Sequence, residues 1–361
     1  MEPLKDQFFN DVFYLKLSQV LHNVVPSIST QEAFETFSTD IEQYELLDRM
    51  YKTSERLHSL LDRPYDKALP IVKEIASAFD GGFVGMTFCD FVARYGLDQT
   101  TISLDALHFM TRFSSAEFAI RYFLRTDFKN TLETMTIWAE DENVHVRRLA
   151  CEGSRPRLPW SFKLDRIIES PRLTFPILEK LKADQELYVK KSVGNHINDI
   201  TKDRTEDVLK LVSAWDLSNT DTNWIVKRGM RSLIKSGNEE ALSLFGVSAK
   251  VDIDVISFEC SKRLLHLNES FDLVCRIVSK SRAKQKLVID YTIVYQKKGG
   301  KLSSKVFKWK EFELLAGEKL DLSKKIEIKN LSTRIHYSGI HEVKLLINGK
   351  NTASSSFELI I

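Results

Sequence analysis

Three nine-residue stretches decide the fold: HVRRLACEG at 145–153, YVKKSVGNH at 188–196 and IVKRGMRSL at 225–233. In each stretch, a valine is followed by two basic residues and then by a small or apolar pair. The valines lie 43 and 37 residues apart, and a helical segment and a short polar turn precede each of them. A period of about 40 residues built of helix, turn and helix indicates stacked repeats.

Helical periodicity extends over the chain up to about residue 248. Apolar residues recur at intervals of three and four in DVFYLKLSQVLHNVV (11–25), ALPIVKEIASAF (68–79) and DVLKLVSAW (207–215), with short turns between such segments. We therefore predict a HEAT-like repeat α-solenoid over residues 1–250, in which the second helix of each repeat lines a concave face.

After about residue 250 the period of the pattern changes to two. Seven short segments alternate in this way and are bounded by turn signals: 251–260, 271–278, 286–296, 304–314, 320–328, 341–349 and 353–361. Seven strands in about 110 residues predict an Ig-like β-sandwich over residues 251–361. Cys260 and Cys275 are too close in sequence to form the inter-sheet disulfide of antibody domains. The predicted fold class is a multidomain chain, α then β.

The composition excludes several classes of protein. The chain has 361 residues, 43% of them hydrophobic and 28% charged, as in an ordinary globular protein. It contains no signal peptide pattern and no apolar run of membrane-spanning length. Its four cysteines form no CxxC pair, so we expect reduced thiols, no metal site and a cytoplasmic location. Because neither GxxxxGK[ST] nor GxGxxG is present, we expect no nucleotide cofactor.

Charge is distributed unevenly along the chain. Residues 1–50 carry a net charge of −6, whereas residues 251–361 carry +7. The basic C-terminal third suggests a polyanionic partner, and the acidic N-terminal region argues against contact with nucleic acid there. In the hairpin at 297–305, Lys297 and Lys298 form either a solvated sheet edge or a second contact with such a partner.

The repeat register aligns basic residues. Arg148, Lys191 and Arg228 occupy the same place in successive repeats, and Arg147, Lys190 and Lys227 occupy the place before it. Equivalent positions in stacked repeats form a row, so these residues predict a basic stripe. The alternative is that they pair with acids on neighbouring helices, and the sequence leaves both interpretations open.

The segment RRLACEGSRPRLPW (147–160) concentrates cationic charge around one acid and one tryptophan. Glu152 projects toward the basic row, or else it is a structural acid paired with Arg148 four residues earlier. Trp160 follows Pro156 and Pro159, so we expect it beyond a helix end and partly exposed. There it could stack on a base or sugar while Arg155 and Arg157 hold phosphates. The other tryptophans of the repeats lie on apolar helix faces, and we expect them in the core: Trp138, Trp215 and Trp224.

A second acid, Glu117, lies in FSSAEFAIRYFL (113–124). Ser114 and Glu117 have the spacing of a capping box, in which the glutamate closes back on a helix N-terminus. Taken alone, this pattern favours a structural role for Glu117.

Three of these motifs together resemble the AlkC family of bacterial DNA alkylation-repair glycosylases: SAEFAIR (115–121), VRRLACEGSRPRLPW (146–160) and YVKKSVGNHINDITKD (188–203). The similarity extends from about residue 75 to 248 and is densest from 102 to 235. Cys151, Tyr122 and Gly194 depart from the residues common in the family, but neither acid is lost. The C-terminal part resembles the Ig-like domain of one AlkC subgroup.

The resemblance implies a monofunctional DNA glycosylase of base excision repair. It would hydrolyse the N-glycosidic bond of bases alkylated to a cation in duplex DNA, 3-methyladenine first, with 3-methylcytosine and 1-methyladenine as further substrates. Family members are thought to act without base flipping, and a monomer is expected. By motif, Glu117 and Glu152 are the catalytic acids, and Arg148, Arg155 and Trp160 lie at the DNA surface.

The further DNA-binding residues that we predict are Arg157, Lys191, Arg228, Lys297 and Lys298. Two other functions stay open at this point. One is a non-catalytic DNA-binding or damage-sensing protein of the same fold. The other is a protein-interaction scaffold, the commonest use of HEAT arrays, which would have no DNA affinity.

Overall fold

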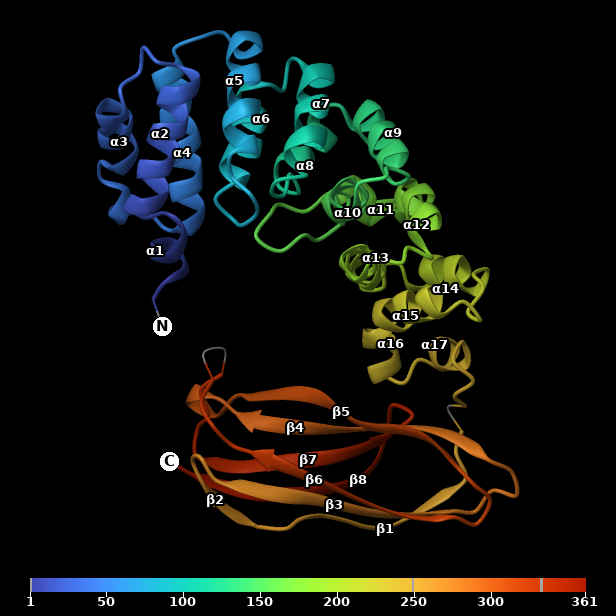
Figure 1. The fold of residues 1–361 in the computed structure, drawn as a ribbon. Helices are drawn as coiled ribbons and strands as arrows, with labels where there is room; N and C mark the ends of the chain where they lie inside the picture. The colour runs from blue at the N-terminus through green and yellow to red at the C-terminus, as the bar shows by residue number, and fades with distance from the viewer. Residues whose placement is uncertain (1, 249, 332–333) are drawn as a thin grey trace. The chain divides into compact units, whose positions relative to one another are not determined.

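The computed structural model describes residues 2–248, 250–331 and 334–361. The chain forms two units, residues 1–229 and residues 230–361 (Figure 1). The first unit is helical, and the second consists of two short helices and a β-sandwich.

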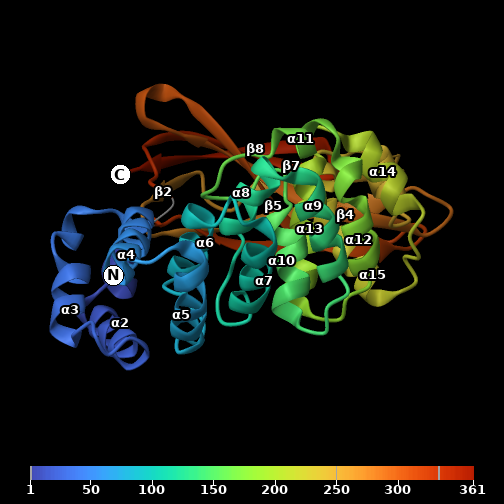
Figure 2. The same cartoon turned by 90° about the horizontal axis from the view of Figure 1, so that it is seen from above.

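The helices of the first unit follow one another in short steps. They are α1 (Leu4–Phe8), α2 (Asp11–Val24), α3 (Thr30–Ser38), the 3-10 turn η1 (Ile41–Gln43), α4 (Leu46–Leu61), α5 (Tyr65–Ser77), α6 (Met86–Tyr95), α7 (Thr100–Met110), α8 (Ala119–Thr126), α9 (Phe128–Trp138), α10 (Val144–Gly153), α11 (Asp165–Glu169), η2 (Pro171–Thr174), α12 (Phe175–Leu181), α13 (Leu187–Ile200), α14 (Thr205–Ser213) and α15 (Thr220–Gly229). Each packs against helices close to it along the chain (Figure 2). This arrangement confirms the predicted helical repeat array.

The three repeated motifs fall on α10, α13 and α15, and these helices pack in that order, α10 on α13 and α13 on α15. The repeated valines, Val146, Val189 and Val226, are fully buried. Asn143 caps α10 by accepting a hydrogen bond from the His145 amide at 2.9 Å. The buried valine fixes the rotation of each helix, so the basic residues that follow it emerge at equivalent places.

The second unit begins with α16 (Arg231–Lys235) and α17 (Glu239–Ser243). The strands are β1 (Ile253–Cys260), β2 (Leu264–His266), β3 (Ser270–Ser279), β4 (Gln285–Gln296), β5 (Leu302–Leu314), β6 (Lys319–Glu327), β7 (Gly339–Ile347) and β8 (Lys350–Ile360), with the 3-10 turn η3 (Lys298–Gly300) between β4 and β5. They form a three-stranded sheet, β1-β3-β6, and a five-stranded sheet, β2-β8-β7-β4-β5 (Figure 1).

The Ig-like sandwich is confirmed, with one strand that the sequence did not indicate. β2 has three residues and pairs in parallel with the end of β8. The other strands agree with the seven predicted segments. In β3, buried and exposed residues alternate, and Leu273, Cys275 and Ile277 face the core. This alternation explains why a period of two was visible in the sequence.

Helices α16 and α17 belong with the sandwich. Leu242 and Val247 are buried against Val288 of β4. The turn after α16 also meets the β7–β8 turn so closely that a Cβ on Gly349 would lie 2.0 Å from the Cα of Gly237. Both glycines have positive φ, 76° and 77°. The structural division therefore falls between residues 229 and 230, before the boundary at residue 250 that the change of period suggests.

Candidate active site and nucleic-acid interface

An open groove of about 390 Å³ lies where the segments before α6 and α8 meet α10 and α13. Its wall contains one acid and one base in direct contact, Glu117 and Arg148. The remaining lining residues are Asp80, Gly81, Gly82, Phe83, Met86, Arg112, Phe113, Ser114, Ser115, His145 and Tyr188. The groove thus combines charged, aromatic and hydroxyl groups on one accessible surface.

Glu117 does not form the predicted capping box. Helix α8 begins at Ala119, and the side chain of its N-cap residue, Phe118, makes no capping hydrogen bond to any residue that the structure describes. Ser114 donates instead to the carbonyl oxygen of Gly82 at 3.0 Å. In a capping box the glutamate is the third residue of the helix, whereas Glu117 lies two residues before the first residue of α8. The glutamate is therefore available for other contacts.

The partner of Glu117 is Arg148. The Nη1 atom of Arg148 contacts Oε2 of Glu117 and also donates to the hydroxyl of Ser115 at 2.9 Å. The same serine donates to Oε2 of Glu117 at 3.0 Å. The Arg148 guanidinium lies over the ring of Tyr188, 4.9 Å from its centroid. Only 16% of the Glu117 side chain and 13% of the Arg148 side chain are exposed, so the pair is largely shielded from water.

Glu152 lies behind Arg148 and is more deeply buried, with 7% of its side chain exposed. Its Oε1 accepts a hydrogen bond from Nη1 of Arg155 at 2.5 Å and lies 3.7 Å from Nη2 of Arg148. Its Oε2 accepts from the hydroxyl of Ser192 at 2.6 Å. Burial raises the pKa of Glu152, but the two guanidinium groups and these hydrogen bonds outweigh it and hold the pKa below its usual range. Glu152 is thus ionised at neutral pH.

Arg155 and Arg157 are both paired with acids of α13 or the turn after it. Arg155 is buried and donates from Nε to Asp199 at 2.8 Å. Arg157 makes a two-nitrogen contact with Asp203, at 3.1 Å and 2.8 Å. Arg155 is therefore closed off from solvent in this structure, whereas Arg157 is half-buried at the surface.

Sequence reasoning missed Arg121, which holds the segment after α10 in place. It is fully buried and donates to the carbonyl oxygens of Gly153, Arg155 and Phe162. Burial, followed by the charge of Arg155, lowers the pKa of Arg121 to about 10, so it stays a cation at neutral pH. The only signal in the sequence was an arginine within an otherwise apolar helical stretch.

Trp160 is exposed, as predicted, with 62% of its surface accessible. Its φ is 64°, and its ring meets the edge of Phe83 at a centroid distance of 6.2 Å. Trp138 and Trp215 are buried, which confirms the prediction for them. The prediction was wrong for Trp224, which is 36% exposed on α15. The Arg228 guanidinium lies 5.6 Å from its ring, so this face of α15 presents an aromatic and a cation together.

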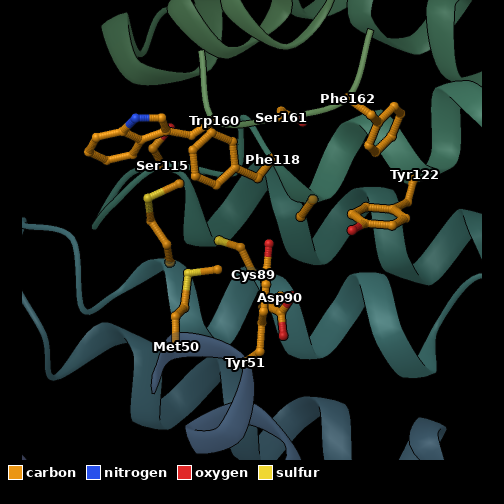
Figure 3. Close-up of a pocket in the computed structure, with 12 residues that line it drawn as sticks. Met50, Tyr51, Cys89, Asp90, Ser115, Phe118, Tyr122, Trp160, Ser161 and Phe162 are labelled. Atoms are coloured by element: carbon orange, nitrogen blue, oxygen red, sulfur yellow. The ribbon is translucent and has the colours of Figure 1, made fainter. Parts of the chain in front are cut away.

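Beneath Trp160 lies a smaller cavity of about 120 Å³ (Figure 3). In Figure 3 the rings of Trp160, Phe118, Phe162 and Tyr122 lie along one side of it, and Met50, Cys89, Asp90 and Tyr51 along the other. Asp90 is already paired with Nε of Arg94 at 2.5 Å. Ser115 lines both this cavity and the groove, whereas neither Glu117 nor Glu152 is among the described residues that line the cavity. Of the two acids, Glu117 lines the groove, and Glu152 lies behind Arg148.

The two basic rows differ in their partners. In the first row, Arg147 pairs with Asp184 at 2.7 Å and Lys190 pairs with Asp221 at 2.6 Å. In the second row, Arg148 pairs with the acids described above, and Lys191 is exposed. Pairing with neighbouring helices thus accounts for much of the basic charge. Lys191 fits the alternative of a solvent-facing stripe.

Arg228, the third residue of the second row, donates to Oδ1 of Asn195 at 3.3 Å. On the sandwich, Lys298 is exposed in η3 and Lys297 is half-buried next to it. The exposed Lys298 is accessible to a polyanion.

Within residues 2–248, 250–331 and 334–361, no cluster of His, Cys, Asp and Glu has the arrangement of a metal site. In the same ranges no helix is both long and apolar enough to cross a membrane. All four cysteines are free and buried: Cys89, Cys151, Cys260 and Cys275. Burial raises the pKa of each thiol, in Cys151 and Cys275 to about 12.

Two family models match the chain, one in its helical part and one over the β-sandwich. Residues 105–233 match the family described as "DNA alkylation repair enzyme". Residues 254–361 match the family described as "Uncharacterised protein YhaZ, C-terminal Ig-like domain". The first match contains Glu117, Glu152 and Trp160.

Similarity to individual proteins extends over the whole chain. The uncharacterised protein YhaZ of Bacillus subtilis is 35% identical over 347 residues, which cover 95% of this chain and 96% of that protein. The solved structure of the alkylpurine DNA glycosylase AlkC of Pseudomonas fluorescens, bound to DNA containing an abasic site analogue, is 41% identical, covers 100% of both chains and gives a TM-score of 0.95. The chain therefore belongs to the DNA alkylation repair enzyme family, among its AlkC-like members with a C-terminal Ig-like domain.

Proposed function

We propose that the chain is a monofunctional DNA glycosylase of base excision repair. It hydrolyses the N-glycosidic bond of cationic alkylated bases in duplex DNA, with 3-methyladenine as the leading substrate and 3-methylcytosine and 1-methyladenine as further ones. It acts as a cytoplasmic monomer, without a metal or cofactor and without flipping the base into a pocket.

One observation carries this proposal: two carboxylates, Glu117 and Glu152, meet at one arginine beside an open groove. A base that carries a positive charge is an activated leaving group. When the C1′–N bond breaks, the base takes the bonding electrons and leaves neutral, and the deoxyribose becomes oxocarbenium-like. Carboxylates stabilise such a cation and accept the proton of the water that attacks it. Neutral adducts lack the leaving-group activation, so the site would act on them slowly.

The DNA-binding part of the proposal rests on exposure and charge. Trp160 lies exposed beside the groove, where it can contact an unstacked sugar or base. The basic residues proposed to contact phosphates are Arg148, Arg155, Arg157, Lys191 and Arg228 of the helical unit and Lys297 and Lys298 of the sandwich. Arg155 and Arg157 keep their acidic partners in the free protein, so contact with phosphate requires an exchange of partners.

The test is release of bases from methylated duplex DNA, separated by chromatography, for the wild type, Glu117→Gln and Glu152→Gln. We expect the wild type to release 3-methyladenine and each glutamine variant to lose about 100-fold or more in rate, as when a group that stabilises charge in the transition state is removed. Binding of a duplex with an abasic analogue is measured in parallel. Release of no base by a wild-type protein that binds DNA would refute the glycosylase proposal.

A second candidate is a DNA-binding damage sensor without catalysis. The observation that favours it is that both oxygens of Glu152 already accept hydrogen bonds, one from Arg155 and one from Ser192. A carboxylate held in this way binds and orients neighbours without needing to react. The base-release assay distinguishes the two candidates, because a sensor binds damaged DNA and leaves the glycosidic bond intact.

A further inference from the structure

Arg148 lies where the proposed reaction would bring the positive charge of the substrate. Its guanidinium contacts Glu117 and lies 3.7 Å from Glu152, and it lines the groove through which a substrate would approach them. A cationic base or an oxocarbenium-like sugar requires the same carboxylate oxygens. In the free protein, Arg148 already supplies a positive charge to these carboxylates.

The two acids depend on Arg148 to different degrees. Glu152 has a closer cation in Arg155 and a hydrogen bond from Ser192, so it stays charge-paired without Arg148. Glu117 receives only Ser115 besides Arg148 in its described contacts. Arg148 therefore offsets the charge of Glu117 most strongly, and Glu117 is the acid that lines the groove.

We propose that Arg148 is a specificity-determining residue that sets how strongly the site prefers a cationic deoxyribose derivative over a neutral one. It does so by competing with the bound cation for Glu117 and by repelling that cation. The interaction of two like charges a few ångströms apart is weakened by water but strong in a shielded site such as this one. The inference rests on the proposed function, because it assumes that Glu117 faces a cation on the sugar or base.

The surroundings of Arg148 support a role beyond structure. It is held over the face of Tyr188 and bonded to the Ser115 hydroxyl, so its charge is fixed at the groove wall. The residue before it gives a matched comparison. Arg147 is on the same helix and is paired with Asp184, and among the described residues it is not part of the groove wall.

The experiment measures the affinity of the full-length protein for two duplexes that differ in one residue. One duplex contains a tetrahydrofuran abasic analogue, which is neutral, and the other contains a pyrrolidine analogue, whose ring nitrogen is protonated. The quantity compared is the Kd for the tetrahydrofuran duplex divided by the Kd for the pyrrolidine duplex, both measured at one salt concentration. Because the phosphates are the same in both duplexes, their contribution to binding cancels in this ratio. We expect Arg148→Met to increase the preference for the pyrrolidine duplex by roughly tenfold.

Three further variants make the result specific. Arg148→Lys keeps the charge and should give a ratio close to that of the wild type. Arg147→Met removes a neighbouring arginine and should leave the ratio unchanged. Arg148→Gln, which keeps a polar side chain without the charge, replaces the methionine variant if that protein does not fold. A circular dichroism spectrum and a thermal transition like those of the wild type show that either variant is folded.

An unchanged or reduced ratio in the neutral variants would overturn the inference, and so would a lysine variant that behaves like the methionine variant. Failure of the proposed function has a different signature: a wild type that releases no base, or that binds both duplexes equally.

Discussion

At the scale of single residues, the site is a chain of alternating charges. Asp199 pairs with Arg155, Arg155 with Glu152, Arg148 lies between Glu152 and Glu117, and every member is at least partly buried. Buried ions cost free energy to remove from water and are tolerated when each has its counter-charge and hydrogen bonds. Loss of one member therefore affects the others.

Asp199 tests this dependence. Asp199→Asn leaves the buried Arg155 with one carboxylate in place of two, and we expect the free energy of unfolding to fall by about 3 kcal/mol, as when one partner of a buried pair is removed. The control is Asp203→Asn, four residues further on, which breaks the surface pair with Arg157 and should cost about 0–1 kcal/mol. Urea unfolding of both variants at neutral pH measures the difference. Equal decreases in the free energy of unfolding of the two variants would contradict the expectation that the buried pair of Asp199 with Arg155 stabilises the fold more than the surface pair does.

The sequence predicted which residues gather at the site and offered one of their pairings, Glu152 with Arg148, which the structure contains, but it did not predict the others. Glu117, Glu152, Arg148 and Trp160 were found from their motifs, and the structure places them around one groove or beside it. Ser192, Asp199 and Arg121 were missed. Ser192 is 40 residues from its partner Glu152, and Asp199 is 44 from Arg155, so only the packing of successive repeats brings them together.

At the scale of elements, α10 and α13 are joined by a histidine. His196 is fully buried, its Nδ1 lies 3.1 Å from the carbonyl oxygen of Cys151 on α10, and its Nε2 lies 3.2 Å from the Thr174 hydroxyl. Since a carbonyl can only accept, Nδ1 carries the proton and Nε2 is free to accept. Burial, and then the charge of Arg155, lowers the pKa of His196 to about 3. The contact between α10 and α13 therefore favours the neutral form of the His196 imidazole.

This pKa predicts how stability depends on pH. Below pH 6.5 the unfolded chain binds a proton at His196 that the folded chain does not, so the contribution of His196 is complete above pH 6.5 and is lost as the pH falls toward about 3. The free energy of unfolding should decrease there by up to about 1.4 kcal/mol per pH unit from this group. In His196→Gln the decrease between pH 6.5 and pH 5 should be shallower by that amount, measured by urea unfolding. Parallel curves for the two proteins would contradict the assignment.

Periodicity predicted the elements well where one face is buried, as in the repeat helices and in β3. It failed at short or irregular pieces. β2 has only three residues and exists because β8 offers it a parallel partner at its end. The capping box at Ser114 and Glu117 had the right spacing but no helix start in reach, because α8 begins at Ala119. A local pattern cannot show where the preceding segment is held by Gly82.

At the scale of the whole molecule, two units of different architecture follow one another. Leu242 of α17 and Val247 after it contribute apolar side chains to the sandwich. A change of period from 3.6 to 2 marks where strands begin, but it does not mark which unit the last helices join. That depends on burial against β4, which is a tertiary contact.

The boundary gives a prediction for isolated fragments. A fragment of residues 230–361 should unfold at a higher temperature than a fragment of residues 251–361, because the shorter one exposes Val288 and loses two buried side chains worth about 1.5–3 kcal/mol each. Thermal unfolding followed by circular dichroism measures this. The control is Lys350→Ala in the longer fragment, which removes the exposed ion pair with Glu239 and should leave Tm nearly unchanged. Equal Tm values for the two fragments would show that α16 and α17 add no stability.

The four buried cysteines bear on the chemical hazards that a protein of this family meets. Methylating reagents attack ring nitrogens of DNA, and they also attack sulfur, where the reactive form is the thiolate. In this chain each thiol is shielded from solvent, and its raised pKa keeps it protonated at neutral pH. Burial thus keeps the four thiols, which are strong nucleophiles as thiolates, out of contact with alkylating reagents dissolved in the surrounding water.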